Sequence, residues 1–188
     1  IKKMEDIIQI FTIQWVGPFA SLKQMKEYLN RPETCEKQLF SFYYICGSKN
    51  GSGYHRSKTD YRYFGIHKQT ETSIEQRLNN AHEHLCEFRE DSRHIWIGSF
   101  ANCDHQSPQN IEDTETLFIS TYRNELTENK KKKKATPSES ICVVNIWYKE
   151  DETEWKKRKA ETRIFSDVMV YEKELGRFSV GNLKAIER

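Results

Sequence analysis

The sequence predicts an α/β protein of the α+β kind, in which a small central antiparallel or mixed β-sheet is flanked by helices. The chain has 188 residues, which is enough for one domain with a real core. Short aromatic and β-branched runs predict strands, amphipathic stretches predict helices, and they follow one another in the order β, β, α, β, α. No apolar run approaches the roughly 18 residues of a membrane-spanning helix, so we expect no membrane span.

The first part of the chain predicts one short helix and two strands. Ser21 is a suitable N-cap for a helix over residues 21–29, whose apolar positions follow helical spacing. Residues 39–46 (LFSFYYIC) and 61–67 (YRYFGIH) are rich in aromatic side chains and predict two strands. The glycine- and serine-rich residues 47–60 predict a long flexible hairpin connection between them.

The remainder predicts two longer helices and three strands. A helix over residues 73–88 begins with a capping box of Ser73 and Gln76, and its buried stripe consists of Ile74, Leu78, Ala81, Leu85 and Phe88. A second helix is predicted over residues 111–126. Strands are predicted at residues 94–100, 141–148 and 163–171, and a loop or disordered segment at residues 130–140.

Composition indicates a reducing compartment and leaves nucleic-acid binding open. Five cysteines are scattered along a chain that shows no export signal at its start, so we expect reduced thiols and a cytoplasmic protein. The net charge is only +2, so nucleic-acid binding depends on where the 30 Lys and Arg residues lie. Residues 130–134 and 156–159 are basic runs, and such runs are either solvated loops or phosphate-binding surfaces.

Two tyrosines are predicted to share one face of the sheet. Successive side chains of a strand point to opposite faces, so Tyr43 faces away from Phe42 and Tyr63 away from Phe64. If the two strands pair, both phenols leave the same face, and Gly65 clears space beside Tyr63. The sequence therefore predicts a shallow surface lined by two phenols.

Glu115 interrupts the apolar side of the helix predicted over residues 111–126. It lies four residues after Ile111 and three before Phe118, whereas Glu112 and Asp113 are predicted to face outward. Burying an unpaired carboxylate is energetically costly, so such a group is paired, protonated or bound to a metal. The pattern alone supports an ion pair with a neighbouring arginine as well as it supports a metal site.

Three motifs together resemble those of the GIY-YIG nucleases: Phe42-Tyr43-Tyr44-Ile45, then Tyr63-Phe64-Gly65-Ile66, then Ile74-Glu75-Gln76-Arg77-Leu78 at the start of a helix. The resemblance implies that Tyr43 and Tyr63 lie in the active site, that Arg77 binds phosphate, and that Glu115 holds one Mg²⁺ ion. It departs from the family at Ser41-Phe42, where glycine and isoleucine are usual, and at Ala81, where a histidine is frequent.

The resemblance covers residues 39–129 and implies a GIY-YIG-like catalytic core there. We expect a single domain over residues 1–188, with a helical addition at residues 1–38 and a basic loop with a strand-rich addition at residues 130–188. Lys68 and His84 are candidates for the catalytic role left open at Ala81, whereas His82 is predicted to lie about 140° around the helix from Arg77. The candidate substrate-binding residues are Asn129, Lys130, Lys131 and Lys132.

The activity implied by the resemblance is metal-dependent hydrolysis of phosphodiester bonds in double-stranded DNA, with a restriction-type endonuclease expected. A water would attack in line, oriented or deprotonated by a tyrosine, for which Tyr63 is favoured. A phenol with a pKa near 10 needs a nearby cation to act as a base at neutral pH. Cutting both strands with one active site would require either a homodimer or successive nicks, and the sequence leaves both open.

Two alternatives remain at the level of the sequence. One is a catalytically inactive nucleic-acid-binding domain that uses the basic runs for phosphates and Trp147 and Trp155 for stacking. The other is an interaction module stabilised by zinc, for which the candidate ligands are His82, Cys86, Cys103 and His105.

Overall fold

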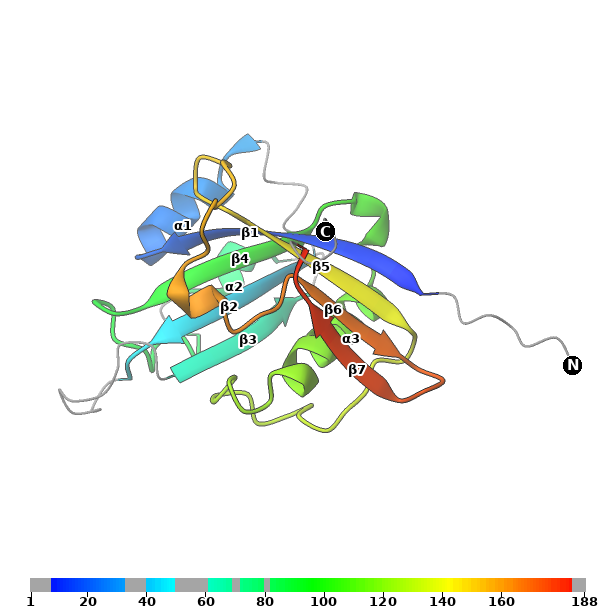
Figure 1. Cartoon of the computed structure of the whole chain (residues 1–188). Coiled ribbons are helices and arrows are strands. Elements are labelled where there is room, and N and C mark those ends of the chain that lie inside the picture. The colour runs from blue at the N-terminus through cyan, green and yellow to red at the C-terminus, as the bar shows by residue number, and fades with distance from the viewer. Residues whose placement is uncertain (1–7, 33–39, 50–60, 69–71, 80–81, 184–188) are drawn as a thin grey trace, which may run out of the picture.

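The computed structural model describes residues 8–32, 40–49, 61–68, 72–79 and 82–183, and it contains one seven-stranded mixed sheet with helices on both faces (Figure 1). The strand order is β3-β2-β4-β1-β5-β6-β7. β1 (Gln9–Phe19) runs parallel to β5 (Ile141–Tyr148), and the other neighbours pair antiparallel. The prediction of an α+β protein with a mixed sheet is therefore confirmed.

Most of the predicted elements are present. The other strands are β2 (Ser41–Gly47), β3 (Tyr61–His67), β4 (His94–Phe100), β6 (Val168–Glu172) and β7 (Arg177–Gly181). The described α-helices are α1 (Leu22–Leu29), α2 (Ile74–Arg77) and α3 (Pro108–Thr121). β6 is shorter than the strand predicted over residues 163–171, because the Phe165 N–H closes a turn on the Thr162 carbonyl and places the Phe165 ring in the core. None of the described helices is long and apolar enough to cross a lipid bilayer.

Strands β1 and β7 are not predicted from the sequence. Residues 1–38 are expected to be helical, yet besides α1 they supply β1, which lies in the middle of the sheet between β4 and β5. Phe11, Ile13 and Trp15 alternate along β1 and are all buried on one face. A strand in this position is hydrogen-bonded along both edges, so pairing partners far along the chain decide its conformation.

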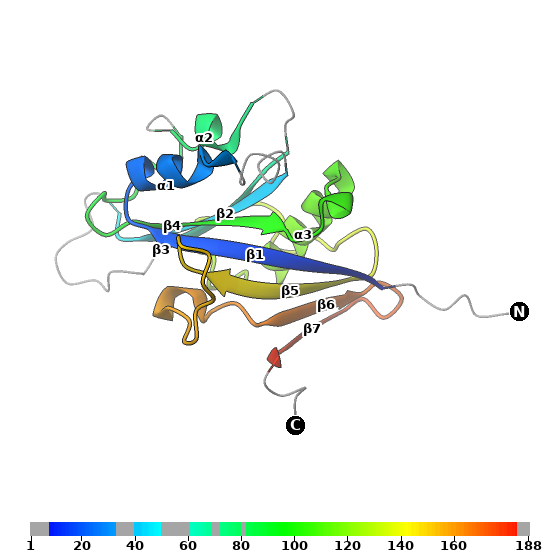
Figure 2. The same cartoon turned by 90° about the horizontal axis from the view of Figure 1, so that it is seen from above.

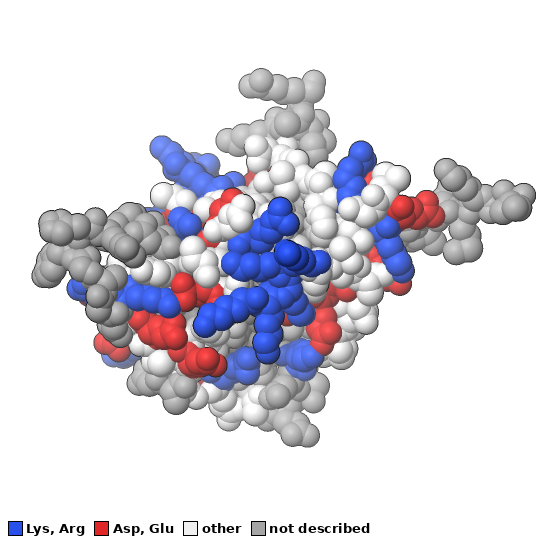
Figure 3. Space-filling model, turned by 90° about the horizontal axis from the view of Figure 1, so that it is seen from below, with Lys and Arg blue, Asp and Glu red and all other residues white. Residues whose placement is uncertain are grey.

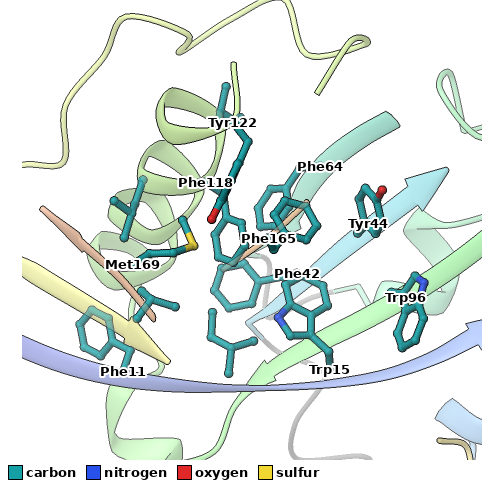
Figure 4. Packing of buried hydrophobic residues seen from close by; sticks show 14 of the residues in the cluster. Phe11, Trp15, Phe42, Tyr44, Phe64, Trp96, Phe118, Tyr122, Phe165 and Met169 are labelled. Carbon is teal, nitrogen blue, oxygen red and sulfur yellow. The ribbon is translucent and has the colours of Figure 1, made fainter. Parts of the chain in front are cut away.

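The two faces of the sheet carry two separate hydrophobic cores. On one face, an aromatic core packs Phe42, Phe64, Trp15 and Phe165 against Phe118 of α3 (Figure 4). On the other face, which we call the tyrosine face, Tyr43, Ile45 and Ile95 pack with residues of α1 and α2. Figure 2 shows α1 and α2 side by side over this second face, where Lys26 and Glu75 form an ion pair between them.

Helix α2 is much shorter than the helix predicted over residues 73–88. Its capping box is formed by Ser73 and Gln76 as predicted, but Leu78 has a φ of −91° and a ψ of 69°, which end the helix. The Asn79 side-chain amide donates to the Gln76 carbonyl (2.6 Å), a bond that competes with a further helical turn. Leu85 and Phe88 are buried nonetheless, in irregular structure. Ala81 lies outside the described residues.

The lysine-rich residues 130–140, which we call the lysine loop, are held against α3. The Ser120 hydroxyl lies within hydrogen-bonding distance of the carbonyls of Lys132 (2.8 Å) and Ala135 (2.5 Å). Asp113 accepts hydrogen bonds from the Ser138 N–H and hydroxyl, both at 2.7 Å. Asp113 is only 6% exposed, so the prediction that it faces outward is wrong. Hydrogen bonds to α3 thus fix a loop that its composition alone would leave free.

Candidate active site

Tyr43 is the centre of the candidate site. It lies on β2 opposite Gly65 of β3, and its side chain is fully buried. A Cβ atom at Gly65 would lie 2.4 Å from Cζ and 2.5 Å from the hydroxyl oxygen of Tyr43. Gly65 therefore makes room for Tyr43, and not for Tyr63 as the sequence suggests. The strand β3 needs a glycine here because the Tyr43 ring lies flat against it.

Tyr63 lies beside Tyr43 on the same face, as the alternation of the strands predicts. The two ring centroids are 6.0 Å apart, and each tyrosine influences the pKa of the other. Tyr63 is partly exposed, in contrast to Tyr43. The ring of His84 stacks on Tyr63 with centroids 3.8 Å apart and an interplanar angle of 25°. His84 thus joins the site as a side chain that orients Tyr63.

His82 belongs to the site, although the sequence places it away from Arg77. Its Nε2 atom lies 3.1 Å from the Tyr43 hydroxyl oxygen. The Leu85 N–H donates to Nδ1 of His82 (3.3 Å), so Nδ1 is an acceptor and the ring proton is assigned to Nε2. Burial, with Arg77 and His84 adding to it, lowers the pKa of His82 to about 4, so the ring is neutral at physiological pH. His82 therefore donates to Tyr43.

Three polar side chains act on the Tyr43 hydroxyl. Nε2 of His82 lies 3.1 Å from its oxygen, and Arg77, at the end of α2, and Tyr63 act on it electrostatically. Burial raises the pKa of Tyr43, while Arg77 and Tyr63 act in the opposite direction. Burial also raises the pKa of Tyr63, to which the neighbouring Tyr43 and Glu115 add. A phenolate would therefore be better stabilised on Tyr43 than on Tyr63.

Glu115 lies on α3, which packs against the aromatic core, and it influences the tyrosines through its charge. Its side chain is 15% exposed, and its negative charge raises the pKa values of both Tyr43 and Tyr63. Lys132 of the lysine loop donates to Oε2 of Glu115 at 2.6 Å. The interrupted apolar stripe thus contains an ion pair, with lysine as the basic partner, and Lys132 is already engaged by a carboxylate.

Two further candidate residues have partners outside the tyrosine cluster. Lys68 forms an ion pair with Glu112 of α3, and this lysine lowers the pKa of Glu112. Asn129 is buried, and its amide accepts from the Phe64 N–H (2.8 Å) and donates to the Phe64 carbonyl (2.7 Å). Asn129 therefore satisfies backbone groups on the outer edge of β3, where no further strand pairs with it among the described residues.

The four candidate zinc ligands are not brought together. His82 packs against Tyr43 on the tyrosine face, whereas His105 packs against Phe11 of the aromatic core. Among the described residues, no three His, Cys, Asp or Glu side chains are grouped so that they could hold a metal ion. The four described cysteines, Cys46, Cys86, Cys103 and Cys142, form no disulfide with one another.

The candidate site thus combines a buried and a partly exposed phenol, a neutral imidazole, a guanidinium group and a carboxylate. All five side chains come from β2, β3, α2, α3 and the segment after α2. Comparisons of the chain with protein-family models, with curated proteins and with solved structures found no match, so the chemistry of these residues has to carry the assignment of function.

Proposed function

We propose that the protein is a metal-dependent endonuclease that hydrolyses phosphodiester bonds of double-stranded DNA. The observation that carries the proposal is the Tyr43 hydroxyl, which lies 3.1 Å from Nε2 of His82, packs beside Tyr63 and is influenced by the charges of Arg77 and Glu115. Donors gathered around a buried phenol oxygen favour its ionised form, which is the form that accepts a proton. The resemblance of three motifs to GIY-YIG nucleases supports the same activity.

The two tyrosines form a path for a proton. Tyr63 is the more exposed phenol and lies beside Tyr43, so it would meet the attacking water and pass a proton on to Tyr43. As the water attacks phosphorus, its proton passes to the Tyr63 oxygen, and the Tyr63 proton passes to an ionised Tyr43. This assigns the water to Tyr63 and the role of final acceptor to Tyr43. Holding a phenol with a pKa of 10 ionised at pH 7 takes about 4 kcal/mol. Burial raises the pKa of Tyr43 and increases this cost, although Arg77 and Tyr63 act against the effect of burial.

Glu115 and Arg77 serve the phosphate. Arg77 would neutralise charge that develops on the phosphoryl oxygens. Glu115 would hold Mg²⁺, a hard cation that one carboxylate can bind when waters and phosphate oxygens fill the remaining positions. The carboxylate already binds a cation, because the Lys132 ammonium group lies 2.6 Å from it. Bound Mg²⁺ would supply a Lewis acid for the scissile phosphate and the leaving oxygen.

An inactive nucleic-acid-binding domain is supported less well, because the tryptophans it needs are occupied. Trp147 is buried and stacks on Trp15 with centroids 5.2 Å apart. Trp155 donates to the Gly17 carbonyl, and the ammonium groups of Lys149 and Lys159 lie 5.3 and 4.9 Å from its ring centroid. Both indoles are therefore already engaged within the protein. A restriction-type role and a homodimer that cuts both strands remain parts of the proposal.

The direct test is nicking of supercoiled plasmid by the purified protein with Mg²⁺ or with EDTA. We expect nicking only with Mg²⁺, and we expect Tyr43→Phe and Tyr63→Phe each to reduce its rate by about 100-fold or more, which is the contribution typical of general base catalysis. Tyr148→Phe is the matched control, because Tyr148 packs on the same face but belongs to β5. Wild-type rates in both tyrosine variants would remove the proposed proton path.

The pH dependence of cleavage provides a second test. Burial holds the pKa of Tyr43 above its usual value of 10, so the ionised fraction rises about tenfold per pH unit between pH 7 and pH 9. We therefore expect single-turnover rates to rise with a slope near one over this range, and Tyr43→Phe to flatten the profile. No additional break in the profile is expected near pH 6.5, since His82, with a pKa of about 4, stays neutral there. A profile that is flat from pH 7 to pH 9 in the wild type would contradict Tyr43 as the base.

A further inference from the structure

Several basic side chains without an acidic partner lie together around the end of α3. Other basic side chains are in ion pairs, as Lys23 is with Glu27, Lys68 with Glu112 and Arg177 with Glu172. Among the described residues, five basic side chains around the end of α3 form no ion pair: Arg123, Lys130, Lys131, Lys133 and Lys134. Figure 3 shows Lys and Arg side chains gathered in the middle of the face on the α3 side.

Part of this face is hollowed into a pocket of about 470 Å³ between the end of α3, the lysine loop and β7. Arg123, Lys133 and Lys134 line it on the polar side, and no acidic residue is among its lining residues. Phe178 and Val180 of β7 form an apolar side, and Val180 is 54% exposed. The pocket thus combines three positive charges with an apolar wall, which suits a ligand that has an anionic and an apolar part.

The walls of the pocket are fixed before any ligand arrives. Ser120, which also lines it, holds the backbone of the lysine loop at Lys132 and Ala135. The ion pair between Lys132 and Glu115 holds the same loop to α3. Thr121 lines the pocket as well. The pocket is therefore built on the last turn of α3 and on a loop that is bonded to it.

We infer that this pocket is a second DNA-binding site, which holds one phosphate and its sugar away from the tyrosines. Arg123 and the two lysines match the phosphate, and Phe178 and Val180 match the sugar. Arg123 lies just beyond the end of α3, whereas Glu115 lies within this helix, so the pocket and Glu115 are separated along α3. The site rests on the proposed function for its DNA ligand, and it would anchor the strand while the tyrosines act on another phosphate.

The test is binding of a fluorescently labelled DNA duplex in EDTA, measured by anisotropy over a range of salt concentrations. EDTA removes Mg²⁺, so the DNA is not cleaved during the binding measurement. We expect the triple variant Arg123→Gln, Lys133→Gln, Lys134→Gln to bind at least about tenfold more weakly, and the slope of log affinity against log salt to fall by about 0.9 for each phosphate that the variant no longer neutralises. The matched control is the double variant Lys156→Gln, Lys157→Gln, since these two exposed lysines also form no ion pair with a described residue. The control should keep the wild-type affinity to within about twofold.

Two further measurements decide what the pocket binds. Val180→Asp places a carboxylate at the exposed apolar wall, so it should weaken DNA binding without lowering the melting temperature. A nucleoside monophosphate, which carries the same phosphate and sugar as DNA, is titrated against the wild type. Tight binding of this small ligand, together with an unchanged DNA affinity of the triple variant, would overturn the inference. Equal DNA affinities and slopes in the wild type and the triple variant would also overturn it, even if the plasmid is nicked. If the variants lose binding but no plasmid is nicked, the nuclease proposal fails and the inference stands.

Discussion

Replacing Glu115 by glutamine is expected to reduce Mg²⁺-dependent cleavage by about 100-fold or more, because the change keeps the shape of the side chain and removes the charge that would hold the cation. DNA binding should survive, since Lys132 is released from its ion pair and remains positively charged. The melting temperature should change little. The Lys132 side chain is 33% exposed and can turn to water, so the pair contributes no more than about 1 kcal/mol to stability.

The matched control for this change is Glu112→Gln. Glu112 lies on the same helix and is also paired with a lysine, Lys68, but its charge is not among the influences on Tyr43 or Tyr63. Mg²⁺ affinity, measured by calorimetry, should fall for Glu115→Gln and not for Glu112→Gln. If Glu115→Gln instead unfolds a large part of the protein while the folded fraction still cleaves DNA, the carboxylate is a structural partner of Lys132 and not a metal ligand.

Gly65→Ala is expected to abolish cleavage and to destabilise the fold, which makes it the second change with a large effect. The added Cβ would lie 2.4 Å from Cζ of Tyr43, a distance that no real Cβ adopts. The Tyr43 ring cannot move aside easily, because it is fully buried in the core of the tyrosine face. Overpacking of this kind destabilises proteins by about 1–3 kcal/mol. A displaced Tyr43 would also lose its bond to His82, so activity should fall even where the protein stays folded.

Gly181→Ala is the matched control for Gly65→Ala. Gly181 also lies in a strand, β7, but a Cβ there would meet no atom within 4 Å. Its melting temperature and cleavage rate should equal those of the wild type. A Gly65→Ala protein with wild-type stability and activity would show that Tyr43 is not confined by β3, and the proposed role of Tyr43 as final proton acceptor would then lose its geometric basis.

The part of the site that strand alternation governs could be predicted from the sequence. A period of two places Tyr43 and Tyr63 on one face and Phe42 and Phe64 on the other, and the two cores divide accordingly. Arg77 could be predicted too, since the capping box at Ser73 places it in the first turns of α2. These features depend only on local geometry, which neighbouring residues determine.

The parts of the site that depend on a helix break or on partners far along the chain could not be predicted from the sequence. His82 is missed because apolar spacing predicts one continuous helix, whereas the helix ends at Leu78 and the chain turns back towards Tyr43. The pair Asn79-Asn80 is the signal that could have indicated this break, since asparagine bonds to the backbone and competes with helix. The sequence suggests Asn129 as a substrate-binding residue. In the structure the oxygen and the nitrogen of its side-chain amide both bond to the backbone of Phe64 in β3.

The central place of β1 has a consequence for how the chain folds. β1 precedes every other strand in the sequence, yet Gln9 pairs with Ile141 and Ile13 pairs with Phe100. On a ribosome this aromatic, β-prone segment would therefore emerge well before either neighbour exists. Long loops must close before it gains its hydrogen bonds, and such topologies fold slowly. Ending synthesis before β5 would leave one edge of β1 unpaired, so shortened chains should aggregate rather than retain a partial sheet.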